Sequence, residues 1–122
     1  MSSLASGRVV VCRVGERRFG LPITAVREVC TGIRLAGVPG VAAPVEGVAN
    51  VRGVLVTVVR AADLLGVSAA SAGPSPWLVV LQFRGGRVGV GVDEVLDLEA
   101  EGSSVDRFDI EGALDPIFGP AT

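Results

Sequence analysis

The stretch Gly47-Val-Ala-Asn-Val-Arg-Gly53, which runs directly into Val54-Leu-Val-Thr-Val-Val59, decides the fold of this chain. Asn50 to Gly53 has the composition of a tight turn, because Asn and Gly tolerate the backbone conformations that turns need. The segment after it is almost entirely apolar and mostly β-branched, which favours a strand in the centre of its sheet. We therefore predict a turn that leads into a central strand of a sheet, with Arg52 presented at the turn.

Short strands joined by turns extend to both sides of that stretch. A segment of Ser, Ala, Gly and Pro at 68–76 is predicted to be a linker. It separates a front half, 8–67, from a back half, 77–110, and a short tail follows at 111–122. Two hairpin-rich halves indicate a single all-β domain, with short helices, built as two small barrels packed together. The predicted extended segments are 8–14, 17–21, 33–38, 54–59, 77–83, 87–92, 93–98 as a bent strand, and 105–110 as a weak last strand.

Three short helical segments are predicted between the strands. After Pro22, apolar residues recur with the spacing of one helical stripe, at Ile23, Val26, Val29 and Cys30. Glu28 lies off this stripe and is predicted to be exposed. A helical turn is predicted from Pro44, and another over 61–65, closed by Gly66.

Composition excludes several classes of function. The 122 residues carry a formal net charge of −2, which gives no electrostatic footprint for nucleic acid. The chain contains no His, so both the commonest general base and the commonest metal ligand are absent. No apolar run approaches the roughly 20 residues that span a bilayer. We therefore expect a cytoplasmic protein that is not inserted in a membrane and holds no metal.

The residues that could carry catalysis have simpler interpretations. Cys12 and Cys30 are predicted to be small buried hydrophobic residues, with a disulfide or a redox role as the alternative. Asp93 and Glu94 are adjacent in a strand, so they face opposite ways and suit a solvated surface or a turn cap better than acid–base work. No catalytic set remains, and we expect a protein that is not an enzyme.

Several blocks of the sequence, in this order, resemble the CheW-like domain, the chemotaxis coupling (adaptor) family. The resemblance covers most of the chain, from about residue 9 to about residue 105, and a series of blocks in order is more specific than any one of them. The blocks are Phe19-Gly-Leu-Pro-Ile23, Val26-Arg-Glu-Val29, Val38-Pro-Gly40, Val45-Glu-Gly-Val-Ala-Asn-Val-Arg-Gly53, Val54 to Val59, Ala62-Asp-Leu-Leu65 and Val88-Gly-Val-Gly-Val-Asp-Glu-Val95.

The resemblance implies a fold and a role. CheW-like domains consist of two SH3-like five-stranded β-barrels, use no cofactor and are not enzymes. They are cytoplasmic scaffolds, recruited to membrane-associated receptor arrays. There they join the cytoplasmic tip of a methyl-accepting chemoreceptor to the regulatory domain of a chemotaxis histidine kinase. The alternative is a small β-barrel ligand-binding module, or a regulatory module cut from a fused sensor kinase.

The resemblance also assigns partner-binding residues. By position in the family blocks, receptor contact falls to Val26, Glu28, Gly47 and Arg52, while Asn50 and Gly53 shape the presentation of Arg52. The C-terminus is shorter than the family norm, which closes with a last strand and a helix. Pro116 and Pro120 argue against a long terminal helix here.

Overall fold

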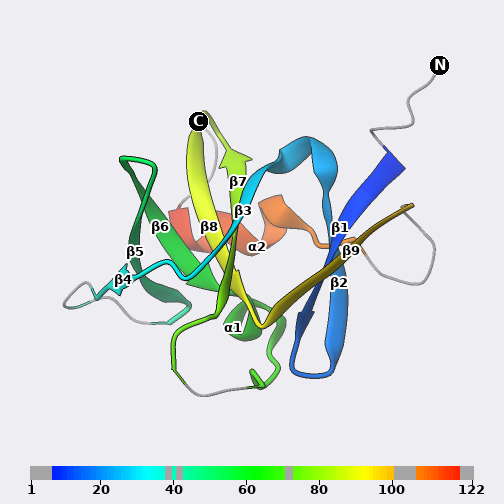
Figure 1. The fold of residues 1–122 in the computed structure, drawn as a ribbon, viewed down its shortest axis with the longest axis horizontal. Coiled ribbons are helices and arrows are strands. Elements are labelled where there is room, and N and C mark those ends of the chain that lie inside the picture. The colour runs from blue at the N-terminus through cyan, green and yellow to red at the C-terminus, as the bar shows by residue number, and fades with distance from the viewer. Residues whose placement is uncertain (1–6, 38–39, 41–42, 71–72, 101–106, 119–122) are drawn as a thin grey trace.

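The computed structural model describes residues 7–37, 40, 43–70, 73–100 and 107–118, and in these ranges nine strands form two sheets (Figure 1). One sheet has three strands in the order β2-β1-β9, and the other has six in the order β3-β7-β8-β6-β5-β4. No helix in the described part of the chain has the length and apolar character needed to cross a membrane. The strands are β1 (Arg8–Val14), β2 (Arg17–Pro22), β3 (Val26–Thr31), β4 (Leu35–Ala36), β5 (Val45–Val51), β6 (Val54–Arg60), β7 (Trp77–Phe83), β8 (Gly86–Val92) and β9 (Glu94–Ala100).

The all-β class with short helices is confirmed, and so is the interior position of Val54–Val59, because β6 lies between β8 and β5. The pairing crosses the linker, however. β1 pairs with β9, β3 with β7, and β6 with β8, so each sheet draws strands from both halves. In the described ranges the two sheets contain three and six strands. These pairings between distant strands depend on the burial of apolar faces, and the order of the strands in the chain does not predict them.

β7 separates two hydrophobic cores. Val79 and Leu81 face the large core, and Leu78 and Val80 face the small core, as expected from the alternation of side chains along a strand. The small core is Ala49, Val51, Val56, Val58, Leu78 and Val80. Among the described residues the large core contains sixteen buried residues, which come from β1, β2, β6, β7, β8 and the helices, together with Phe108.

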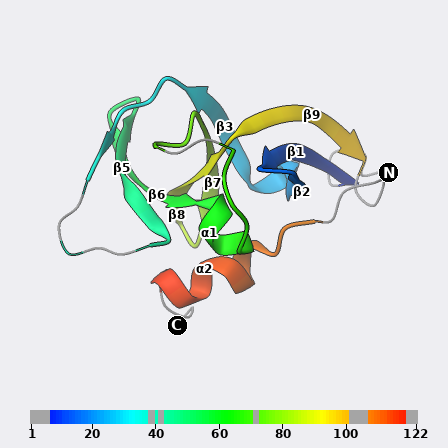
Figure 2. The ribbon, with the colours of Figure 1, turned by 90° about the horizontal axis from the view of Figure 1, so that it is seen from below.

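The six-stranded sheet curls around the small core. Cys30 on the edge strand β3 and Leu35 on the opposite edge strand β4 both pack against that core, together with Ile33 between them. Figure 2 shows the strands of this sheet, among them β3, β5, β6, β7 and β8, curving around the small core. The curl brings the two edges of the sheet toward each other, which is the arrangement that a small barrel requires.

Two segments predicted to be helical are strands instead. After Pro22 only a three-residue 3-10 helix, Ile23–Ala25, forms before β3 begins at Val26. Likewise, the helical turn predicted after Pro44 is replaced by β5, which pairs with β6. Both segments are rich in Val, and a partner strand is available to each, so pairing overrides the helical spacing. The predicted helix at 61–65 is confirmed as α1 (Ala61–Leu65), with Gly66 at its C-terminal cap.

The C-terminal segment also differs from expectation. Residues 105 and 106 lie outside the described ranges, Arg107 forms one isolated bridge with Gly20, and α2 (Ile110–Phe118) occupies the region predicted to be a strand and a tail. Helix α2 contains Pro116. It forms despite the hydrogen bond lost there because Leu114 is fully buried in the large core.

Candidate protein-interaction site

The turn between β5 and β6 presents Arg52 to solvent. Arg52 and Gly53 have φ values of +52° and +83°, the backbone of a two-residue type I′ hairpin turn. The side chain of Asn50 holds this turn, because its Oδ1 accepts a hydrogen bond of 2.8 Å from the Gly53 N–H. The Arg52 side chain is 81% exposed. The turn predicted from the sequence is therefore present, with Asn50 and Gly53 shaping it.

Arg52 is paired with Glu28 across the curl of the sheet. Its Nε donates to Glu28 Oε2 at 3.1 Å, although the two residues are 24 positions apart in the chain. Glu28 lies on β3, where residues alternate between half-buried and exposed, and its side chain is 27% exposed. The helical spacing predicts an exposed Glu28. The strand instead turns this carboxylate partly inward, toward the turn that carries Arg52.

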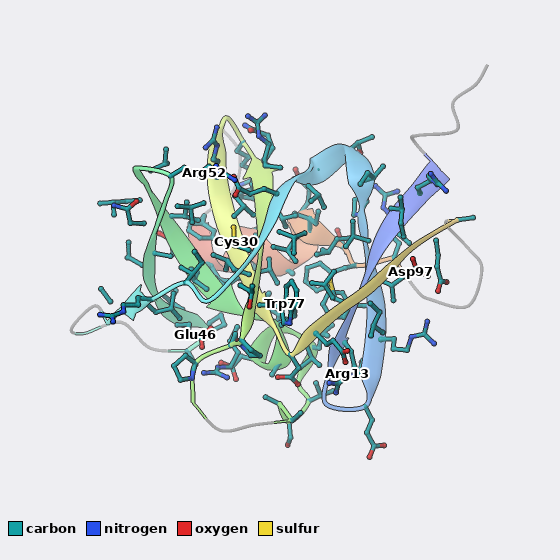
Figure 3. All side chains as sticks on the ribbon, viewed as in Figure 1. Arg13, Cys30, Glu46, Arg52, Trp77 and Asp97 are labelled. Atoms are coloured by element: carbon teal, nitrogen blue, oxygen red, sulfur yellow. The ribbon has the colours of Figure 1, made fainter. Side chains whose placement is uncertain are left out.

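Cys30 contacts the same carboxylate oxygen. Its Sγ donates to Glu28 Oε2 at 3.2 Å, and Figure 3 shows Arg52 and Cys30 on neighbouring parts of the curled sheet, with Glu46 away from both. The pKa of Glu28 is lowered from its usual value, first by the hydrogen bond from Cys30 and then by the hydrogen bond from Arg52. The charges of Arg52 and Arg87 also lower this pKa, while partial desolvation raises it. The carboxylate therefore stays ionised at neutral pH. The ion pair is lost only as the pH falls through this lowered pKa.

Exposed apolar residues lie close in the sequence to both members of the ion pair. Val29 on β3 is 38% exposed, and Val54 and Leu55, directly after the turn, are 41% and 73% exposed. A shallow pocket of about 290 Å³ lies between β3 and the turn, lined by Glu28, Val29, Cys30, Thr31, Ile33, Val51 and Arg52. Arginine is enriched in protein–protein interfaces, so the exposed Arg52 is the candidate contact residue of this surface.

Residues 8–111 match the sequence model of the CheW-like domain family. The chain belongs to this family. The match confirms the resemblance seen in the sequence blocks.

Two relatives extend the comparison. The CheW-like domain is 33% identical over 90 residues to the chemotaxis protein CheW of Rhizobium meliloti (strain 1021), covering 74% of this chain and 58% of that protein. It is similar in fold to the crystal structure of scaffolding protein TtCheW from Thermoanaerobacter tengcongensis, with a TM-score of 0.71 and 23% identity over 79% of this chain and 66% of that one. The chain thus spans somewhat less than two thirds of the length of each relative.

The remaining two predicted site residues lie apart from the ion pair in this CheW-like domain. Val26, at the start of β3, is half-buried, is paired with Leu81, and packs against the large core. Gly47 is buried under β4, where a Cβ would lie 2.6 Å from the carbonyl oxygen of Ala36. The structure brings together Glu28, Asn50, Arg52 and Gly53, whereas Val26 packs against the large core and Gly47 against β4.

Gly47→Ala is therefore expected to lower the free energy of unfolding by about 1–3 kcal/mol, because the added methyl group forces the β4 backbone away from β5. Urea denaturation measures the change. Gly37→Ala is the matched control, since a Cβ there meets nothing within 4 Å. Equal stability of the two variants would contradict the packing role of Gly47.

Cys30 and Arg87, which act on Glu28, were not predicted from the sequence, and neither was the exposure of Leu55. Had 26–31 been interpreted as a strand, the spacing of two residues would have placed Cys30 and Glu28 on one face. Leu55 follows the predicted turn and alternates with the buried Val56, which a one-sided strand pattern would have indicated. Arg87 lies on β8, and no local signal relates it to Glu28.

Proposed function

We propose that this CheW-like domain is a non-catalytic adaptor that couples the cytoplasmic tip of a chemoreceptor to the regulatory domain of a chemotaxis-type histidine kinase. The proposal rests on family membership and on one observation above all: Arg52 is largely exposed at its turn while it is paired with Glu28. In this role the domain works in the cytoplasm and reaches membrane-associated receptor arrays through its partners. It needs no cofactor, because it acts only by binding other proteins.

Arg52 retains donors for a partner. In the described part of the chain its hydrogen bond to Glu28 uses Nε, so the two terminal nitrogens of the guanidinium keep their N–H groups for another acceptor. A carboxylate on the receptor could take two of these in parallel, with Leu55 and Val54 excluding water around the contact.

The Arg52→Ala variant tests this interface. Its affinity for a receptor cytoplasmic fragment, measured by isothermal titration calorimetry, is expected to fall by about 1–3 kcal/mol, the cost of losing a charge-assisted hydrogen bond in an interface. Arg17→Ala, which removes an exposed arginine at the β1–β2 hairpin, is the control and should bind like the wild type. Binding by Arg52→Ala as tight as that of the control would argue against this site.

The adaptor role needs a second measurement, because binding to the receptor alone does not make a coupler. Size-exclusion chromatography of the domain with a receptor fragment and a kinase regulatory domain should yield one complex that contains all three. Mutually exclusive binary complexes would overturn the coupling function even if each partner binds.

A further inference from the structure

Cys30 links the small core to the candidate site. It is half-buried on β3, opposite Leu78 of β7, and packs against the small core together with Ile33 and Leu35. On the other side, its Sγ lies 3.2 Å from Glu28 Oε2. One small side chain therefore touches both the fixed interior and the carboxylate that holds Arg52.

The two donors on Glu28 Oε2 differ in how firmly they are held. Arg52 is long and 81% exposed, so packing does not determine where its guanidinium lies. Cys30 has one side-chain dihedral angle, and the strand pairing and the small core fix its position. The small core thus fixes the Cys30 thiol, the thiol fixes the Glu28 carboxylate, and the carboxylate fixes the Arg52 guanidinium.

We propose that Cys30 is a positioning residue, whose thiol holds the Glu28 carboxylate in the place from which it orients Arg52 toward the partner. The part that concerns a partner rests on the proposed function. The part that concerns Glu28 is a property of the isolated domain.

The ionisation state of Cys30 suits this role. Burial, followed by the hydrogen bond to Glu28 and the charge of Glu28, raises the pKa of the thiol, against the opposing charge of Arg52. Cys30 is therefore an S–H donor at neutral pH and not a thiolate. Among the described residues, the charged or titratable groups that act on Glu28 are Cys30, Arg52 and Arg87.

Two substitutions separate a hydrogen-bonding Cys30 from an apolar filler. Cys30→Ser keeps a donor of similar size, whereas Cys30→Val keeps apolar bulk and removes the donor. If the thiol positions Glu28, serine retains the function and valine loses it. If Cys30 only fills space, valine is the better replacement and serine, with a hydroxyl against the small core, is the worse one.

The first readout is the titration of the Glu28 carboxyl carbon, followed by NMR in the isolated domain. We expect the pKa of Glu28 to rise toward its ordinary value in Cys30→Val and to stay near the wild-type value in Cys30→Ser. Cys12→Ala, which alters the other thiol, in the large core, is the control and should leave the titration of Glu28 unchanged. An unchanged titration in Cys30→Val overturns the proposal.

The second readout is affinity for the receptor fragment. We expect a loss of about three- to tenfold in Cys30→Val, and binding within twofold of the wild type in Cys30→Ser. A Cys30→Val protein that binds as the wild type does would overturn the positioning of Arg52. Failure of the wild-type domain to bind any receptor fragment would instead refute the proposed function, and the NMR titration would still decide the role of Cys30 toward Glu28.

Discussion

Replacing Glu46 by alanine is expected to lower the free energy of unfolding by about 2–4 kcal/mol, because it removes the acceptor at the centre of a nearly buried polar cluster. The Glu46 side chain is only 7% exposed. Its Oε2 accepts from Arg60 Nη2 and from the Ser75 N–H, each at 2.8 Å, and its Oε1 accepts from Ser75 Oγ at 2.9 Å. The variant leaves a partly buried guanidinium and two Ser75 donors without this acceptor.

Urea denaturation of Glu46→Ala and Glu46→Gln tests this expectation. The glutamine variant keeps one acceptor oxygen but loses the charge, so its stability should fall between those of the wild type and the alanine variant. A loss below about 0.5 kcal/mol in Glu46→Ala would show that the cluster contributes no more than an exposed ion pair does.

The Glu46 cluster also anchors the segment 68–76, which was predicted to be a linker. The described residues of 68–76 are fastened to the sheets: Ser75 bonds to Glu46, and the carbonyl of Gly73 accepts from Arg60 at 2.9 Å. Near its start, the Ala70 N–H donates to Asp93 Oδ2 at 2.7 Å. A composition of Ser, Ala, Gly and Pro predicts the absence of regular structure here, but it does not reveal these side-chain anchors.

Strands and turns with strong local signals could be predicted from the sequence. Val54–Val59 is almost entirely apolar and follows a turn of Asn and Gly, and the structure has a strand and a turn at these positions. The segment 26–31 could not be assigned this way, because Val26, Val29 and Cys30 fit a helical stripe while Val26, Glu28 and Cys30 fit one face of a strand. A partner strand more than 40 residues away decides between the two patterns.

The candidate site was predictable to the same extent. The turn that exposes Arg52 is local, so its residues could be identified in the sequence. The contact of Arg52 with Glu28 depends on the curl of a six-stranded sheet, and that curl arises from packing around the small core. Helix α2 was missed for a related reason: Pro116 argues against a helix locally, while burial of Leu114 stabilises one.

Leu78→Ala is expected to lower the free energy of unfolding by about 2–5 kcal/mol, because it opens a cavity in the small core. Leu78 is 5% exposed and pairs with Cys30, so the cavity also removes support from the residue that contacts Glu28. Gly89 on β8 faces the same side chain: a Cβ there would lie 2.7 Å from Leu78 Cδ1 and 3.2 Å from Val58 Cγ2. Gly89→Ala alone should therefore cost about 1–3 kcal/mol by overpacking.

The double variant distinguishes direct packing of Gly89 against Leu78 from a general loss of stability in the sheet. In Leu78→Ala/Gly89→Ala the new methyl group enters the space that the leucine has left, so the loss should be smaller than the sum of the single losses, with a coupling energy of about 0.5–3 kcal/mol. Leu81→Ala provides the control, since Leu81 lies on the same strand but faces the large core. Its loss should add to that of Gly89→Ala. If urea denaturation shows additive losses for Leu78→Ala with Gly89→Ala as well as for Leu81→Ala with Gly89→Ala, then Gly89 does not make room for Leu78. The packing of Leu78 under Cys30 would then not depend on Gly89.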